Sequence, residues 1–279
     1  MLPTLFPFIV ITTLMLKTKA FRLISDILGP CFGRFFLVSN EGSLAIIIGF
    51  LCGYPMGAKI INDLYEEHSI SLNEAKYLLS FCNNTSPMFI VSFFVYQILG
   101  ETQLLFPTLF ALYAAPIIMS FITRYIYLLP VNKIDFHNNS EKRYNKKIEI
   151  SFQLLDTTII DSITLILKIG GYIMLFSIFI SLSYPLIAYC PLLFYFIPLL
   201  EVTNGITMFH TLITSTVSYL LMIFLISFGG VCAIGQTRCV IKSNDIKIFP
   251  YFLQKIITAI IAVIISFCML LINQNIRLL

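Results

Sequence analysis

Gly53-Tyr54-Pro55-Met56-Gly57-Ala58-Lys59 interrupts one apolar run of this chain, and Leu79-Ser80-Phe81-Cys82-Asn83-Asn84-Thr85-Ser86-Pro87 interrupts the next. A similar pair follows in the second part of the chain, at Glu201-Val202-Thr203-Asn204-Gly205-Ile206 and Ile226-Ser227-Phe228-Gly229-Gly230-Val231-Cys232. Gly57 and Gly205 are 148 positions apart, and Ser80 and Ser227 are 147 apart, so both copies keep nearly the same internal spacing. Matched breaks in two halves of an apolar chain are typical of transporters that bind their substrate near the middle of the bilayer.

The composition indicates the class of protein. Hydrophobic residues make up 58% of the 279 residues, charged residues make up 11%, and the mean hydropathy is +0.91. Soluble domains carry about 25% charged residues, so we expect an all-α polytopic protein embedded in a lipid bilayer. The net charge of +4 is small and spread over loops, which favours a role in membrane orientation. No nucleic-acid partner is expected.

Apolar runs between charged residues give the expected membrane elements. They cover residues 2–16, 43–58, 77–99, 104–129, 164–189, 192–211, 212–234 and 251–273. Segment 43–58 should enter the membrane and return as a hairpin, so that successive basic loops stay on one side. Residues 151–168 have a different pattern, with apolar residues at three- and four-residue steps, which predicts an amphipathic helix in the membrane interface. Its apolar positions are Phe152, Leu155, Ile159, Ile163 and Ile166.

One long polar segment divides the chain. Residues 130–150 contain five basic residues and are expected to be a cytoplasmic linker, since basic loops face the cytoplasm. Two related membrane halves follow from this division, residues 1–129 and 151–279, which form one integrated membrane domain with broken or re-entrant helices, as in transporters. Two further basic groups are placed in cytoplasmic loops by the same rule. They are Lys17, Lys19, Arg22 and Arg34, and Arg238, Lys242, Lys247 and Lys255.

The breaks are the predicted binding site. Non-helical backbone at membrane depth persists only where protein or a wet cavity surrounds it, so the breaks predict a cavity. A helix that ends near Cys82 should restart after Pro87 and direct its free N–H groups at a carboxylate. Glu201 could bind a coupling proton or sodium ion, because an acid near the bilayer centre needs a partner. The candidate substrate contacts are Gly57, Lys59, Asn83, Asn84, Thr85, Ser86, Thr203, Asn204, Gly205, Ser227 and Gln236.

These candidates also have structural interpretations. Asn83-Asn84-Thr85-Ser86-Pro87 could be a kink or a simple loop between helices, and Glu201 could be a solvated residue near the interface. Lys59 could steer an anion or extend to the membrane surface. No nucleophile motif, cofactor motif or metal-binding cluster is evident, so we expect neither an enzyme nor a resident cofactor or metal.

At the breaks the chain resembles the sporulation integral membrane protein YlbJ (SpoVV) family, whose halves carry a nucleoside-recognition or Gate domain. The resemblance covers most of the chain, and the chain is shorter than usual before its Leu2-Pro3-Thr4-Leu5-Phe6-Pro7-Phe8 segment and in its middle. The matching residues are 53–59, 71–90, 201–205, 227–230 and 235–236. The resemblance implies a protein of the outer forespore membrane that moves dipicolinate toward the forespore, and a distant similarity to concentrative nucleoside transporters.

Two kinds of function are compatible with these observations. The first is a secondary transporter or facilitator for a small organic anion, dipicolinate above all. The second is a membrane scaffold for spore development that carries no solute. Nucleoside transport is a further alternative, at the level of the substrate. The solute, the coupling ion and the oligomeric state stay open at this point.

Overall fold

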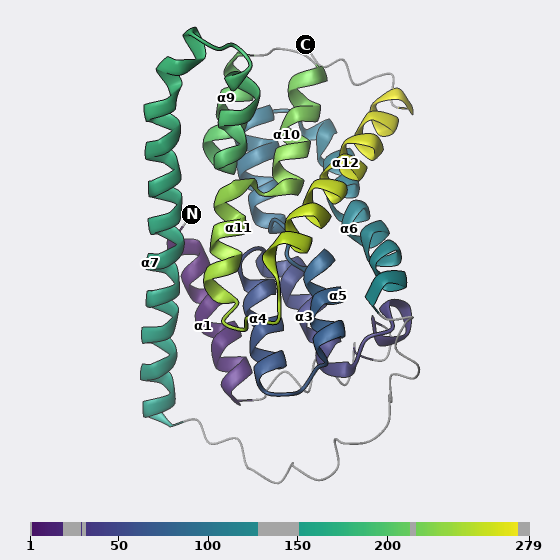
Figure 1. Cartoon of the computed structure of the whole chain (residues 1–279), viewed down its shortest axis with the longest axis vertical. Coiled ribbons are helices and arrows are strands. Elements are labelled where there is room, and N and C mark those ends of the chain that lie inside the picture. The colour runs from purple at the N-terminus through teal and green to yellow at the C-terminus, as the bar shows by residue number, and fades with distance from the viewer. Residues whose placement is uncertain (1, 19–28, 30–31, 128–150, 213–215, 273–279) are drawn as a thin grey trace.

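A computed structural model describes residues 2–18, 29, 32–127, 151–212 and 216–272, and the regular elements within these ranges are helices (Figure 1). The first half contains α1 (Leu2–Thr18), α3 (Asn40–Cys52), α4 (Met56–Glu66), α5 (Leu72–Cys82), the π-helix η1 (Phe89–Leu99), η2 (Thr102–Leu104) and α6 (Leu105–Tyr127). The second half contains α7 (Phe152–Ser183), η3 (Tyr184–Ala188), α8 (Leu193–Phe196), η4 (Ile197–Leu200), α9 (Val202–Leu212), α10 (Thr216–Phe228), α11 (Gly230–Val240) and α12 (Ile248–Ile272).

Within the part of the chain that the structure describes, four stretches are helical, long and apolar enough to cross a membrane. They are Thr102–Tyr127, Phe152–Ala188, Thr216–Val240 and Ile248–Ile272. The expected all-α polytopic membrane protein is therefore confirmed. Two of the expected uninterrupted spans, 104–129 and 251–273, correspond to α6 and α12 over the part of each that is described. The predicted linker 130–150 lies outside the described residues, as do Lys19 and Arg22.

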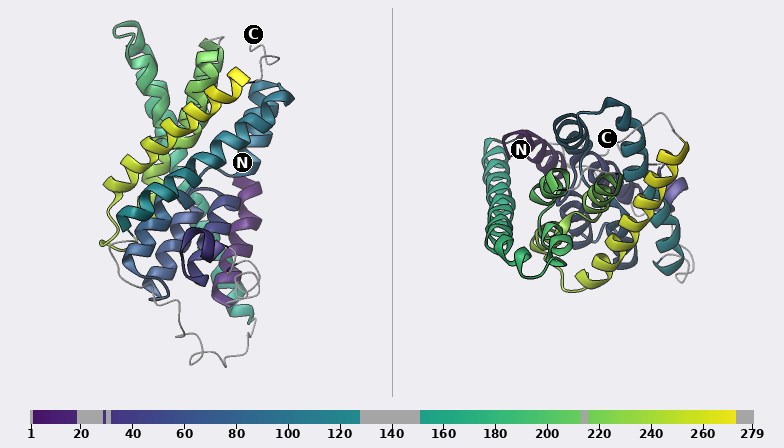
Figure 2. Two further views of the ribbon diagram at one scale, coloured as in Figure 1. Left: turned by 90° about the vertical axis from the view of Figure 1, so that its right-hand side faces the viewer. Right: turned by 90° about the horizontal axis from the view of Figure 1, so that it is seen from above.

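The two halves repeat one order of elements and run in opposite directions. In each half a leading helix, α1 or α7, precedes a broken hairpin, a second broken helix and a long closing helix, α6 or α12. Figure 1 shows α1 and α6 ending toward the lower end of the molecule, whereas α7 and α12 end toward its upper end. The long helices α6 and α12 pack against each other, and both lie obliquely in the turned view of Figure 2. Such an inverted arrangement is common among secondary transporters.

Two apolar clusters form the core, and each takes side chains from both halves. The first joins α1, α3, α4 and α5 to Leu165 and Ile169 of α7 and to Tyr251 at the start of α12. The second joins η1 and α6 to α9, α10 and Ala262 of α12. Separating the halves would expose both clusters, so the halves form one interlocked body.

Residues 151–168 do not form a separate interfacial helix, and this prediction was wrong. They are the first half of the continuous helix α7, which packs along α1. The side chains of Thr158 and Ser162 are buried, while Phe152 is 87% exposed and Ile163 is 44% exposed. In a bilayer, apolar side chains can face the lipid, and small residues let helices approach closely. Most of the apolar stripe therefore marks the outer face of this helix, while Ile166 packs against the first core cluster.

Candidate functional site

The first-half breaks, residues 53–57 and 83–86, lie against each other. The chain leaves α3 at Cys52, turns at Gly53 with φ of 80°, and enters α4 at Met56 beside α3. A helical hairpin therefore forms, but it is longer than the expected segment 43–58, which covers its turn and most of α3. Helix α5 ends at Cys82 and helical structure resumes at Pro87, as predicted. The Tyr54 backbone N–H donates to the Asn84 carbonyl oxygen at 2.8 Å. Each break thus supplies a hydrogen-bond partner for a backbone group that has no helical partner in the other break.

Glycine allows these two breaks to cross. A Cβ on Gly57 would lie 2.7 Å from the Cys82 carbonyl oxygen, and a Cβ on Gly53 would lie 2.8 Å from the Ser86 nitrogen. Both neighbours are backbone atoms, which cannot rotate away as a side chain can. Gly57, predicted as a substrate contact, brings α4 against the end of α5 in the structure.

The second-half breaks are narrower than the sequence pattern, since Glu201 alone separates η4 from α9 and Gly229 alone separates α10 from α11. Glu201 forms the N-terminal cap of α9. Its carboxylate is 2% exposed and accepts hydrogen bonds from the backbone N–H groups of Thr203 at 3.0 Å and Asn204 at 2.9 Å. The Asn204 side-chain amide adds a third hydrogen bond at 3.0 Å. These two backbone N–H groups are therefore not free to bind a substrate carboxylate in this conformation. Glu201 is buried, so its interpretation as a solvated interfacial residue is wrong.

The end of α10 packs against the loop that contains Glu201. Gly229, with φ of 86°, separates α10 from α11, and Gly230, the first residue of α11, also has a positive φ of 76°. A Cβ on Gly230 would lie 3.3 Å from the Leu200 carbonyl oxygen, and a Cβ on Gly205 would lie 2.3 Å from the Pro198 carbonyl oxygen. The second half thus repeats the crossing of the first half, with glycine again at the points of closest approach.

Polar contacts join the breaks of the two halves. The Thr85 hydroxyl donates to the Ile226 carbonyl oxygen at 2.8 Å, a carbonyl close to the break that ends α10. The Asn83 side-chain amide donates to the Thr237 hydroxyl and the Tyr251 hydroxyl, both at 2.8 Å. Asn83, Asn84 and Thr85 are 1%, 6% and 7% exposed. These predicted substrate contacts do come together, and in this conformation their partners are protein groups.

Lys255 completes this network, although the sequence analysis placed it in a cytoplasmic loop. Helix α12 begins at Ile248 and carries Lys255 inside the protein, where it is 2% exposed. Its ammonium nitrogen lies 3.2 Å from the Asn83 backbone oxygen and 3.3 Å from the Asn84 side-chain oxygen. Lys255 and Tyr251 are four residues apart and share one face of the helix. The four-residue spacing within an apolar run was a sequence signal that Lys255 lies inside the protein. The positive-inside rule led instead to its assignment to a cytoplasmic loop.

The remaining predicted contacts have separate places. The Lys59 ammonium group pairs with Asp63 at 3.1 Å, one turn along α4. The Ser86 hydroxyl accepts from the Phe89 N–H at 3.3 Å and caps the restarted helix. Ser227 is 8% exposed, and Gln236 is 4% exposed with its side-chain amide 3.3 Å from the Cys232 sulfur.

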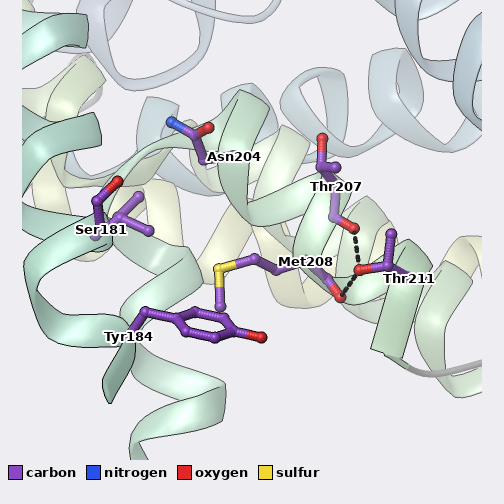
Figure 3. Close-up of a pocket in the computed structure, with 7 residues that line it drawn as sticks. Ser181, Tyr184, Asn204, Thr207, Met208 and Thr211 are labelled. Carbon is purple, nitrogen blue, oxygen red and sulfur yellow. Dashed lines mark hydrogen bonds between the residues drawn. The ribbon is translucent and has the colours of Figure 1, made fainter. Parts of the chain in front are cut away.

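A pocket of about 390 Å³ lies between α7 and α9, away from the first-half breaks (Figure 3). Of the predicted substrate contacts, Asn204 alone lines it, and the Asn204 amide also donates to the Ser177 hydroxyl at 2.7 Å. Asn204 therefore connects the pocket to Glu201. The lining residues are Ile180, Ser181, Tyr184, Asn204, Thr207, Met208 and Thr211.

Comparison with known proteins identifies a relative over almost the whole chain. The sporulation integral membrane protein YlbJ of Bacillus subtilis (strain 168) is 27% identical over 302 residues, which cover 96% of this chain and 73% of that protein. No protein-family model matches the chain, and no solved structure matches it. The similarity agrees with the resemblance carried by the breaks, and it supports a relationship of this chain to the sporulation integral membrane protein YlbJ family.

Proposed function

We propose that this multi-pass membrane protein acts in sporulation as a secondary transporter or facilitator for a small organic anion, most specifically dipicolinate, in the outer forespore membrane. The sporulation role is supported by the name of the Bacillus subtilis relative. Dipicolinate and the forespore membrane come from the family resemblance. We propose transport and not catalysis, because the polar groups at the breaks form contacts between helices and contain no arrangement of nucleophile and base.

The observation that carries the proposal is the crossing of four helix breaks between two inverted halves. Interrupting a helix in lipid leaves backbone groups that need new partners, and each unsatisfied group costs several kcal/mol. A protein that only packed its helices together would gain nothing from four such interruptions. In transporters the same arrangement provides polar groups near the midplane and lets the two repeats move about a fixed site.

The charges at the crossing favour an anionic substrate. Lys255 places a buried ammonium group on the first-half breaks, and Asn83, Asn84 and Thr85 add polar groups beside it. We propose that the coupling cation, a proton or sodium ion, acts through Glu201, whose carboxylate is buried at the other pair of breaks.

Uptake into vesicles tests the proposal. The purified full-length chain is placed in proteoliposomes, and uptake of labelled dipicolinate is measured under imposed proton and sodium gradients against empty vesicles. We expect protein-dependent uptake that falls in Asn84→Ala and Glu201→Gln and persists in Gly171→Ala, a change in α7 that meets no neighbouring atom within 4 Å.

The same assay separates the alternatives. Uptake that excess nucleoside abolishes would favour nucleoside as the substrate. A folded protein that carries neither compound under any gradient would contradict transport and favour the scaffold.

A further inference from the structure

We infer that Lys255 is the anion-binding residue of this transporter, and that its ammonium group exchanges the oxygens of Asn83 and Asn84 for a carboxylate of the substrate. This inference rests on the proposed transport function and adds to it the residue that recognises the negative charge. It also defines what must change at the first-half breaks when substrate binds.

The first argument is the charge balance around Lys255. Among the described residues, the ion pairs within 4.0 Å are Lys17 with Asp161 and Lys59 with Asp63, so no described carboxylate pairs with Lys255. Burial of an ammonium ion costs several kcal/mol even after the protein relaxes. Two neutral amide oxygens offset only part of this cost, because they bring dipoles and no net negative charge. A substrate carboxylate would supply the missing charge.

The second argument is the geometry of the present contacts. The distances from the ammonium nitrogen to its two oxygen partners are 3.2 and 3.3 Å. A well-formed hydrogen bond between an ammonium group and a carboxylate is about 2.7–2.9 Å long. The existing contacts are therefore longer than the hydrogen bonds of the ion pair that would replace them.

The third argument is that the groups around Lys255 can accommodate the exchange. The Asn83 amide donates to hydroxyl groups on α11 and α12, and the Asn84 amide donates to the Phe81 carbonyl oxygen in the last turn of α5. When the ammonium group turns to a ligand, these bonds keep the break in place. The freed Asn84 side-chain oxygen can then accept a hydrogen bond from the ligand or from water.

The increase in melting temperature on ligand binding tests this inference without requiring transport. The purified full-length protein in detergent is heated with dipicolinate or with its neutral diamide, which has the same ring and nearly the same shape. We expect dipicolinate to raise the apparent melting temperature of the wild type and the diamide to have no effect. Lys255→Met should weaken dipicolinate binding about 10- to 150-fold, the value of one hydrogen bond to a charged group.

Two further variants provide the controls. Lys242→Met makes the same change of charge at an exposed position in the loop before α12, and it should bind as the wild type does. Lys255→Gln keeps a donor for the Asn83 oxygen but removes the charge, so it should also lose dipicolinate binding. It provides the test if Lys255→Met does not fold. Equal stabilisation of the wild type and both Lys255 variants would overturn the inference and leave transport itself intact. A wild type that no carboxylate stabilises would also overturn it, and the uptake assay would decide separately whether a solute is carried.

Discussion

Gly49→Ala tests the crossing of the helices most directly. Gly49 lies on α3 opposite the end of α5, and a Cβ added there would be 2.0 Å from the Cys82 carbonyl oxygen and 2.9 Å from its carbon. Real Cβ contacts essentially never fall below 3.0 Å, so the two helices must separate by about 1 Å. Both contacted atoms are backbone, so no rotamer change can relieve the clash. Overpacking of this kind costs about 1–3 kcal/mol, and the rigid neighbours place this case at the upper end.

The measurement is the apparent melting temperature of purified protein in detergent, taken as the temperature at which half of the protein is lost from the monodisperse peak. At about 2–4 °C per kcal/mol for a protein of this size, a loss of about 3 kcal/mol corresponds to about 6–12 °C. Gly171→Ala is the matched control, because nothing lies within 4 Å of the added Cβ in α7. Alanine exceeds glycine in helix propensity by about 0.5–1 kcal/mol, so this control should be slightly stabilised. Equal melting temperatures for the two variants would refute the close approach of α3 and α5.

Three further predictions concern buried polar groups. Asn83→Ala should lower the melting temperature, since two buried hydroxyl groups lose their donor at about 1–3 kcal/mol for each unsatisfied group; an unchanged value would contradict the network. Glu201→Ala, which removes the acceptor oxygens, should cost about 1 kcal/mol of helix capping in the same assay, and stability equal to that of the wild type would contradict the cap. Burial raises the pKa of the Glu74 carboxyl above its ordinary 4.5, with the nearby Glu41 adding to the shift and hydrogen bonds from Ser39 opposing it. The folded state thus holds this proton more tightly, so the unfolding free energy should fall as pH rises from 4.5 through the raised pKa. Glu74→Gln should remove this pH dependence. Parallel pH profiles of stability for the wild type and Glu74→Gln would exclude Glu74 as its cause.

The sequence predicts the breaks well because glycine, proline and clustered polar residues act locally. Pro87 lacks the N–H group that would continue a helix from Cys82, and it follows the polar residues Asn83 to Ser86, so the interruption was predictable from adjacent residues. The long spans α6 and α12 follow from length and hydropathy for the same reason. Each of these features depends on a few adjacent residues.

Features that depend on which face of a helix packs against the protein were not predictable from adjacent residues. The apolar stripe on α7 indicates an inner face in a soluble protein, but lipid accepts the same side chains, so Phe152 lies outside and Thr158 lies inside. Lys255 follows basic loop residues in the sequence and was grouped with them. The packing of α12 against Asn83 shows that this lysine is internal. The acid at Glu201 was recognised, but its role as a cap depends on where α9 begins.

The two buried charges differ in how they are satisfied, and this difference separates their roles. Glu201 bonds to groups two and three positions along its own helix, so the cap moves with α9 as a rigid unit. Lys255 bonds to Asn83, 172 positions away and in the other half. Any shift of one half against the other must therefore stretch the contacts of Lys255, while those of Glu201 can persist. A ligand that supplies a carboxylate to Lys255 compensates for the contact that such a shift breaks, which links binding of an anion to movement between the halves. The sequence alone gave Glu201 the greater weight, but the long-range contacts make Lys255 the charge that responds when the halves move.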